Sequence, residues 1–243
     1  MRLDVFLAGK GFYKSRSRAS AAIKSGAVKI DGRKVTAPAF EVTGNEAIEA
    51  SETGRYVSRA GEKLEHALDV FGIGVGGACA LDIGASTGGF TDCLLKRGAA
   101  FVYALDVGSG QLDNSLRGDS RVKCIENFNA RSAKRTDFER GIDIITMDVS
   151  FISQSLIYPA CADILPAGKI MITLVKPQFE AGREHVGKGG IVHDTDGKLI
   201  ASINKKLTSA AKECGFEQTG FTKSPVTGGD GNTEYLALFV KTE

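Results

Sequence analysis

The sequence lacks several features on which whole classes of protein depend. It has no tryptophan, only three histidines among 243 residues, and no run of about eighteen apolar residues that could cross a membrane. Its five cysteines are scattered without a C-x-x-C pair or a zinc-like spacing, which is typical of small core residues in a reducing compartment. The N-terminal segment is too charged for a signal peptide. We therefore expect a cytoplasmic protein with no metal site and no membrane partner, and we favour a monomer.

The charge is distributed unevenly, although the net value is only +2. Residues 1–60 hold 11 Lys or Arg against 6 Asp or Glu, a net +5, whereas residues 61–243 hold 20 against 23, a net −3. A small basic module ahead of a slightly acidic body indicates that the module binds a polyanion.

The basic N-terminal segment has the pattern of a small α+β domain. Apolar residues at helical spacing predict two helices, and the pair Asp31-Gly32 predicts a tight hairpin. Cations line the solvent side of the second helix, where they form either an ordinary solvated face or a row of phosphate contacts. The expected elements are helices 2–9 and 16–25 and strands 27–30, 34–36 and 46–49.

The most informative stretch of the chain is the glycine turn, residues 80–90 (ALDIGASTGGF), which reads as a buried strand, a turn and the start of a helix. Such a turn leaves backbone N–H groups free and lets a ligand approach the main chain. Ser86 stands where a dinucleotide fingerprint requires its second glycine, and Asp82 would repel a pyrophosphate. The turn therefore suits a cationic or hydroxylated ligand, and it resembles motif I of the S-adenosylmethionine-dependent methyltransferases.

The next predicted strand, residues 100–105, ends in Asp106. An acid at this place accepts hydrogen bonds from ribose hydroxyls in nucleotide-binding sheets. The alternative is that Asp82 and Asp106 only cap strand ends and that the glycines serve packing. The combination at this spacing favours a cofactor site.

Strands alternate with helices through the rest of the chain, which predicts a mostly parallel α/β sheet. The last two strands have no helix between them, so one of them is expected to be antiparallel. Residues 180–194 are too irregular for a helix or a strand. The expected helices are 59–71, 89–97, 152–164 and 197–213, and the later strands are 122–126, 142–147, 169–175, 217–223 and 233–240.

Charged residues gather where the predicted strands end. Asp148 and Lys176 follow two strands directly, and Glu234 begins the last strand, whose start lies at the same edge if it is antiparallel. Lys63 falls within or beside the apolar stripe of helix 59–71, where an isolated lysine would simply extend its amine to solvent.

The four residues Lys63, Asp148, Lys176 and Glu234 match, in order, the K-D-K-E tetrad of FtsJ-like RNA ribose 2′-O-methyltransferases. The whole chain resembles the TlyA family (haemolysin A-like proteins), bacterial rRNA cytidine-2′-O-methyltransferases. The segments that carry this resemblance are YVSRAGEKL (56–64), LDIGASTGGFT (81–91), ALDVG-x-GQL (104–112), MDVSFIS (147–153), LVKPQFEAGRE-x-VGKGG (174–190) and GN-x-EYL (231–236).

The resemblance implies an S4-type RNA-binding domain over residues 1–52, a linker over 53–59 and an FtsJ-like methyltransferase domain over 60–243. It also implies S-adenosylmethionine as cofactor and ribosomal RNA or ribosomal subunits as partner. The implied RNA contacts are Lys14, Arg16, Arg18, Lys24, Arg33 and Lys34. The implied cofactor contacts are Asp82, Gly84, Ser86, Thr87, Gly88, Gly89, Phe90, Asp106, Val107, Asn129 and Asp148.

The chemistry of the tetrad fits the implied reaction. A ribose 2′-hydroxyl is a weak acid, so its attack on a sulfonium methyl group requires help in losing the proton. A lysine acts as a base only where its surroundings favour the neutral amine, and a second lysine and desolvation both do so. Lys176 is the candidate base or hydroxyl-orienting group, and Lys63 and Glu234 are expected to position the nucleotide. The alternative is a pair of structural salt bridges at a strand edge.

Two functions of other classes compete with this one. The haemolysin name attached to the family raises a toxin-like activity, for which the sequence offers neither a secretion signal nor a membrane-spanning stretch. The other rival is a non-catalytic RNA-binding protein, against which the intact tetrad and glycine turn speak.

Overall fold

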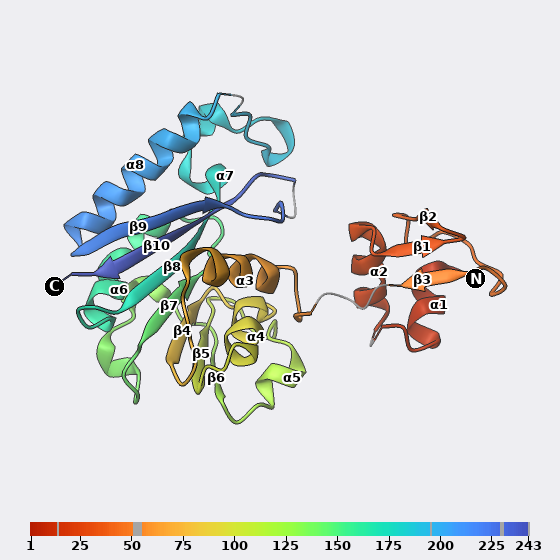
Figure 1. Cartoon of the computed structure of the whole chain (residues 1–243), viewed down its shortest axis with the longest axis horizontal. Helices are drawn as coiled ribbons and strands as arrows, with labels where there is room; N and C mark the ends of the chain where they lie inside the picture. The colour runs from red at the N-terminus through yellow and green to blue at the C-terminus, as the bar shows by residue number, and fades with distance from the viewer. Residues whose placement is uncertain (14, 51–54, 195, 229–230, 243) are drawn as a thin grey trace. The chain divides into compact units, whose positions relative to one another are not determined.

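The computed structural model describes residues 1–13, 15–50, 55–194, 196–228 and 231–242. The chain forms two compact units, Met1–Val57 and Ser58–Glu243 (Figure 1). The predicted linker, 53–59, falls partly on residues 51–54, outside the described residues, so its limits and those of the two predicted domains stay predictions. Among the described residues, no helix is both long and apolar enough to span a bilayer.

The first unit packs two helices against a three-stranded antiparallel sheet with β1 in the centre. The hairpin turns at Asp31 and Gly32, both at positive φ (49° and 75°), as the Asp-Gly pair predicts. The predicted inward residues Ala19, Ala22 and Ile23 are buried in its core. The elements are α1 (Leu3–Gly9), α2 (Arg16–Ser25), β1 (Val28–Ile30), β2 (Arg33–Lys34) and β3 (Ile48–Ala50).

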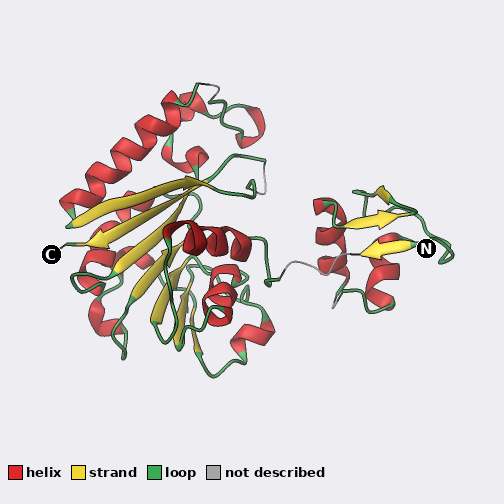
Figure 2. Ribbon diagram, viewed as in Figure 1, coloured by secondary structure: helices red, strands yellow, loops and turns green. Residues whose placement is uncertain are grey.

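The second unit is built on a seven-stranded sheet of order β6-β5-β4-β7-β8-β10-β9 (Figure 2). Only β10 runs antiparallel to its neighbours β8 and β9, so the predicted mostly parallel sheet with one antiparallel strand is confirmed. The central strands read as unbroken apolar runs because both of their faces are covered. The strands are β4 (Cys79–Ile83), β5 (Phe101–Leu105), β6 (Val122–Ile125), β7 (Ile144–Met147), β8 (Ile170–Val175), β9 (Phe216–Lys223) and β10 (Tyr235–Lys241).

Helices cover both faces of this sheet (Figure 1). On one face, α3 (Ala60–Phe71) packs against α4 (Gly89–Lys96) and reaches β9 and β10. On the other, α6 (Tyr158–Ile164) and α8 (Lys198–Glu213) bury their apolar stripes against alternate residues of the strands. Two short helices, α5 (Asn114–Arg117) and α7 (Pro177–Glu180), were not predicted.

The prediction of one helix over 152–164 is wrong in its first half. The chain instead makes a loop, a 3₁₀ turn at Gln154–Leu156 and then α6. Pro159 lies in the first turn of α6, the only part of a helix where its missing N–H costs nothing. Phe151 in the loop has φ +64°, a left-handed conformation that an aromatic residue seldom adopts.

Candidate active site

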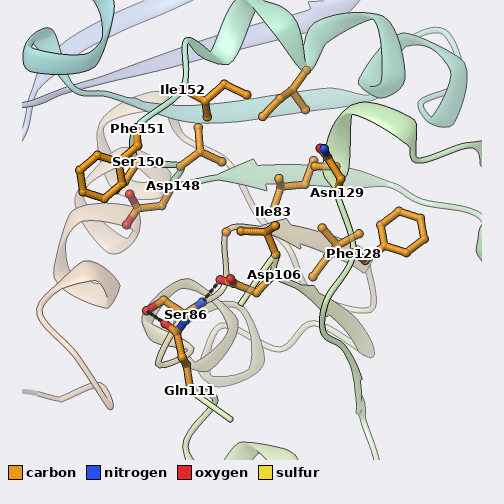
Figure 3. Close-up of a pocket in the computed structure, with 16 residues that line it drawn as sticks. Ile83, Ser86, Asp106, Gln111, Phe128, Asn129, Asp148, Ser150, Phe151 and Ile152 are labelled. Carbon is orange, nitrogen blue, oxygen red and sulfur yellow. Dashed lines mark hydrogen bonds between the residues drawn. The ribbon is translucent and has the colours of Figure 1, made fainter. Parts of the chain in front are cut away.

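The carboxyl ends of β4, β5 and β7 open onto a cavity of about 470 Å³ (Figure 3). Its size is in the range of sites for small molecules, and it lies where open α/β sheets bind ligands. Figure 3 shows Asp148, Ser150 and Phe151 on one wall, with Asp106 and Ser86 facing them across the opening. We call this space the main cavity.

Asp106 organises the glycine turn. Its Oδ2 accepts a hydrogen bond of 2.7 Å from the Ser86 backbone N–H (Figure 3). Its Oδ1 accepts one of 2.7 Å from the backbone N–H of Gly108. The amides of Gly84 and Ala85 donate to the carbonyl of Leu105. The sequence led us to expect free N–H groups along the turn, but these amides are used within the protein. The carboxylate itself faces the cavity and keeps lone pairs for a hydroxylated ligand.

Asp82 lies in a different setting from the one expected. It is fully buried, and its two carboxylate oxygens accept hydrogen bonds from the hydroxyls of Thr91 (2.7 Å) and Thr146 (2.9 Å). Burial raises the pKa of Asp82 to about 7, against the opposing effect of the two threonines. Asp82 is not among the described residues that line the main cavity, so this geometry does not support direct contact with a ligand.

The glycines of the turn serve close approach between chain segments. A Cβ on Gly84, which has φ +79°, would lie 2.5 Å from the carbonyl oxygen of Asp148. A Cβ on Gly89 would lie 2.2 Å from the hydroxyl of Ser58, so this glycine lets the start of α3 approach α4. Gly88 has φ +93° and packs against leucine side chains. The fold itself therefore excludes a branched side chain at Gly84, whatever such a residue would do to a cofactor.

A second, smaller cavity of about 210 Å³ shares Gly84, Ser86, Asp148 and Ser150 with the main one. Lys176 lines it. The two cavities therefore form one continuous recess along the edge of the sheet, and we call the second the lysine cavity.

Lys176 holds a defined position at this recess. Its Nζ lies 2.6 Å from Oδ1 of Asp148 and donates a hydrogen bond of 2.9 Å to the hydroxyl of Ser150. Both charged side chains are mostly buried, with 12% and 17% of their surface exposed. Because β7 and β8 are parallel neighbours, the residues that follow them meet at the same edge.

Lys63 forms the second ion pair, with Glu234. Its side chain is only 9% exposed and that of Glu234 3%, so Lys63 does not extend to solvent as an isolated lysine would. Glu234 directly precedes β10, whose antiparallel direction brings its start to the same sheet edge as the ends of β7 and β8. The four tetrad residues thus form two lysine–carboxylate pairs, of which Lys63–Glu234 is buried and Lys176–Asp148 is partly exposed.

The predicted cofactor residues divide by location. Six of them line the main cavity and three others the lysine cavity, whereas Asp82 and Gly88 line neither among the described residues. The first six are Gly84, Ser86, Asp106, Val107, Asn129 and Asp148, and the other three are Thr87, Gly89 and Phe90.

The predicted RNA-binding cations of the first unit differ in whether the structure describes them and in their contacts within the domain. Arg16 is 61% exposed, but its Nε lies 3.0 Å from Asp4, which also pairs with Arg2. Lys24, Arg33 and Lys34 are exposed, and the Lys34 side chain passes over Gly26 at the end of α2. Lys14 lies outside the described residues, and Arg18 belongs to α2.

Several residues at the site were not singled out from the sequence. Gln111 accepts a hydrogen bond of 3.0 Å from the Ser86 hydroxyl at the cavity rim, and Phe151 is 91% exposed at its mouth. Buried Asn232 ties the irregular segment to the start of β10, since its amide donates to Gly190 and accepts from Val192. The only available signal was that all three lie in segments that carry the resemblance, ALDVG-x-GQL, MDVSFIS and GN-x-EYL.

A model of the FtsJ-like methyltransferase family matches residues 56–241. The chain belongs to the FtsJ-like methyltransferase family. A model of the S4 domain matches residues 1–48. The first unit is therefore an S4 domain and the second a methyltransferase of the FtsJ type, and S-adenosylmethionine is its methyl donor.

Full-length relatives agree with this assignment. The chain is 48% identical to hemolysin A of Brachyspira hyodysenteriae, over 99% of this chain and 100% of that one. It is 41% identical to the 16S/23S rRNA (cytidine-2′-O)-methyltransferase TlyA of Mycobacterium tuberculosis, over 100% and 90% of the two chains. A solved structure of a candidate hemolysin from Streptococcus thermophilus covers 100% of this chain and 89% of its own, with 42% identity and a TM-score of 0.79.

The recess fits the methyl donor of the family. The main cavity offers apolar walls for an adenine ring, including Val107 and Phe128, and a carboxylate at Asp106 for hydroxyl groups. Gly84 lines both cavities, and because it has no side chain, none projects into the recess at this position.

Proposed function

We propose that the chain transfers the methyl group of S-adenosylmethionine to a ribose 2′-hydroxyl of ribosomal RNA, at a cytidine, in ribosomes or ribosomal subunits. The relative from Mycobacterium tuberculosis bears the name of that activity. The observation that supports the proposal best is the contact between Lys176 and Asp148 at the edge of a nucleoside-sized cavity. We further propose a monomer that acts in the cytoplasm, with an RNA-binding domain over 1–52, a linker over 53–59 and a catalytic domain over 60–243.

We assign the main cavity to the nucleoside of the cofactor. Asp106 holds its ribose hydroxyls, and Val107, Phe128 and Asn129 surround its base. When bound, the cofactor supplies an electrophilic methyl group on a positively charged sulfur. The lysine cavity, which is lined in part by Ser86, Asp148 and Lys176, then takes the ribose of the target nucleotide.

Lys176 is the group that acts on the target hydroxyl. Its amine already makes two polar contacts, with Asp148 and Ser150, so its position is fixed before RNA binds. In its neutral form, an amine held in this way orients the hydroxyl for in-line attack and accepts its proton, which converts the amine to the ammonium. Asp148 balances the charge on the lysine while the proton moves.

Lys63 and Glu234 support this centre. Their burial means that neither charge tolerates loss of the other, which fixes α3 and the start of β10 at the same edge. The two residues therefore act on the position of the target nucleotide indirectly, through α3 and β10, rather than exchange its proton.

The S4 domain supplies RNA affinity. We assign the phosphate contacts to Lys24, Arg33 and Lys34, and to Lys14 and Arg18 from the resemblance alone. Arg16 has a partner in Asp4, so we expect its removal to act on the domain as well as on RNA. Each cation that contacts a phosphate steepens the salt dependence of RNA binding by about 0.7–0.9 in log–log slope.

The experiment that tests the function is methylation with labelled S-adenosylmethionine and ribosomal subunits from a strain that lacks the enzyme, followed by mapping of the label. Lys176→Ala should lower turnover by about 10²–10⁴-fold with cofactor binding retained. Lys169→Ala is the matched control, because Lys169 precedes β8, the strand that Lys176 follows, and pairs with Asp143 at 2.8 Å.

The outcomes separate the alternatives. Label on a ribose 2′-oxygen supports the proposal, whereas RNA binding without any label would favour a non-catalytic RNA-binding protein. Lys176→Arg keeps the charge but cannot accept a proton at ordinary pH. Near-normal turnover in that variant would show that the position only stabilises charge.

A further inference from the structure

The two loops that carry Asp148 and Lys176 are joined by contacts that continue well past these residues. After Lys176 meets Asp148 and Ser150, the ring of Phe179 lies 5.0 Å from that of Phe151. We call residues 148–154 the β7 loop. It forms one wall of the main cavity, and α7, which starts directly after Lys176, runs along it.

Glu180 makes the last of these contacts. Its Oε2 accepts a hydrogen bond of 2.6 Å from the Ser153 hydroxyl, and its Oε1 accepts one of 2.9 Å from the Gln154 backbone N–H. The side chain is 6% exposed. Gln154 is itself buried and accepts a hydrogen bond of 3.0 Å from Tyr158 in α6. Both oxygens of Glu180 therefore fix the far end of the β7 loop to the helix that follows Lys176.

A buried carboxylate is a costly way to hold a loop unless the geometry matters. Burial raises the pKa of Glu180, so the environment disfavours the charged form that accepts both hydrogen bonds. An apolar residue of similar size would fill the same space without this cost. It would not, however, hold the Gln154 N–H, and a buried N–H without an acceptor is itself unfavourable.

We propose that Glu180 is a positioning residue for methyl transfer. It fixes the β7 loop against α7 and so sets the distance between Asp148 and Lys176. The inference rests on the proposed function of that pair. With Glu180 in place, the β7 loop is held at both ends, by Lys176 at its start and by Glu180 at its end. Without it, the far end of the loop loses both hydrogen bonds to α7 and keeps the contact of Gln154 with Tyr158, and Phe151, at positive φ, has a more relaxed conformation available to it.

The competing explanation is that Glu180 serves stability alone. Three variants separate the two. Glu180→Ala removes both acceptors, Glu180→Gln keeps one acceptor and gains a donor for Ser153, and Val75→Ala removes buried volume near the amino ends of the strands, away from both loops. The free energy of unfolding of each variant is measured by urea denaturation, so that Val75→Ala serves as the control for lost stability.

Two readouts address position. The single-turnover rate at saturating RNA and cofactor should fall by up to about 100-fold in Glu180→Ala, since small misplacements of reacting groups cost that much. Glu180→Gln should recover most of the rate, and Val75→Ala should retain it. Hydrogen exchange of a peptide spanning 149–154 should be faster in Glu180→Ala than in the wild type or in Val75→Ala.

Equal single-turnover rates in Glu180→Ala and Val75→Ala would overturn the inference, as would unchanged exchange of the 149–154 peptide. A raised KM for RNA with an unchanged single-turnover rate would also overturn it, because that result places Glu180 in binding rather than alignment. A failure of the proposed function would give other results. The wild type would give no label on RNA, or Lys176→Ala would turn over normally, whatever the effect of Glu180 on the β7 loop.

Discussion

Asp82 offers the sharpest test of the site, because the sequence and the structure assign it different roles. Its ordinary pKa is 3.8, and burial, with a smaller contribution from the charge of Asp148, raises it to about 7 in the folded protein. The hydroxyls of Thr91 and Thr146 oppose this shift only in part. The folded protein thus holds the Asp82 proton more tightly than the unfolded chain does.

The sign of the effect follows from this difference. Below about pH 4 both states are protonated, and Asp82 leaves the free energy of unfolding unchanged. Between about pH 4 and 7 the unfolded chain has released the proton and the folded protein has not, so the free energy of unfolding falls by up to about 1.4 kcal/mol per pH unit. Above pH 7 the loss is complete, on the order of 4 kcal/mol.

The variant Asp82→Asn removes this dependence, since the amide is neutral at every pH and still exchanges hydrogen bonds with both threonines. Relative to the wild type, its free energy of unfolding should rise progressively between about pH 4 and 7 and then level off. Urea denaturation of both proteins across this range measures the difference. A difference that stays constant with pH would refute the argument from burial.

Calorimetry with S-adenosylmethionine on the same variant decides the role. Because Asp82 is not among the residues lining either cavity, Asp82→Asn should bind the cofactor nearly as well as the wild type. A loss of affinity of about tenfold or more, 1.4 kcal/mol, would instead support the direct contact with the cofactor that the sequence predicts.

Three further predictions follow from other contacts. Gly84→Ala should lower the free energy of unfolding by about 1–3 kcal/mol or more in urea denaturation, because its Cβ would approach the Asp148 carbonyl at positive φ. Lys63→Met should lower it by about 3–5 kcal/mol by leaving Glu234 buried without its partner, and adding Glu234→Gln should recover stability but not RNA methylation. Asn232→Ala should speed hydrogen exchange of a peptide spanning 187–192 and slow methylation; unchanged exchange would mean that the segment is held by other contacts.

The parts of the fold that the sequence predicts are those set by local periodicity. The helix over 16–25, the strands near the glycine turn and the single antiparallel strand all follow from spacing and turn residues. The place of Asp106 was predicted because the carboxyl ends of parallel strands all lie at the same edge of such a sheet. The predicted start of helix 152–164 was wrong because the Ser153 hydroxyl and the Gln154 amide bond to Glu180, which lies 26 residues after Gln154.

The residues that sequence reasoning missed share this dependence on distant partners. Asn232 acts on residues some forty positions earlier, and nothing near it in the chain indicates that its side chain is buried. The buried setting of Asp82 was not predicted for a related reason. Its neighbours in sequence place it at a strand end, but only the packing of α4 and β7 shows that two threonine hydroxyls already take its oxygens.

The two lysine–carboxylate pairs are unequal, and this inequality bears on the alternative that both are structural salt bridges. Lys63 and Glu234 are the more deeply buried pair, and neither is among the residues that line the two cavities. Lys176 and Asp148 are more exposed, both line the lysine cavity, and Lys176 also bonds to Ser150. In a deeply buried pair, removal of one partner leaves the other charge buried and unpaired, which is strongly destabilising. Partial exposure to a cavity is what a group needs when it must meet a substrate, so we expect the loss of Lys176 to act on turnover and the loss of Lys63 to act on stability first.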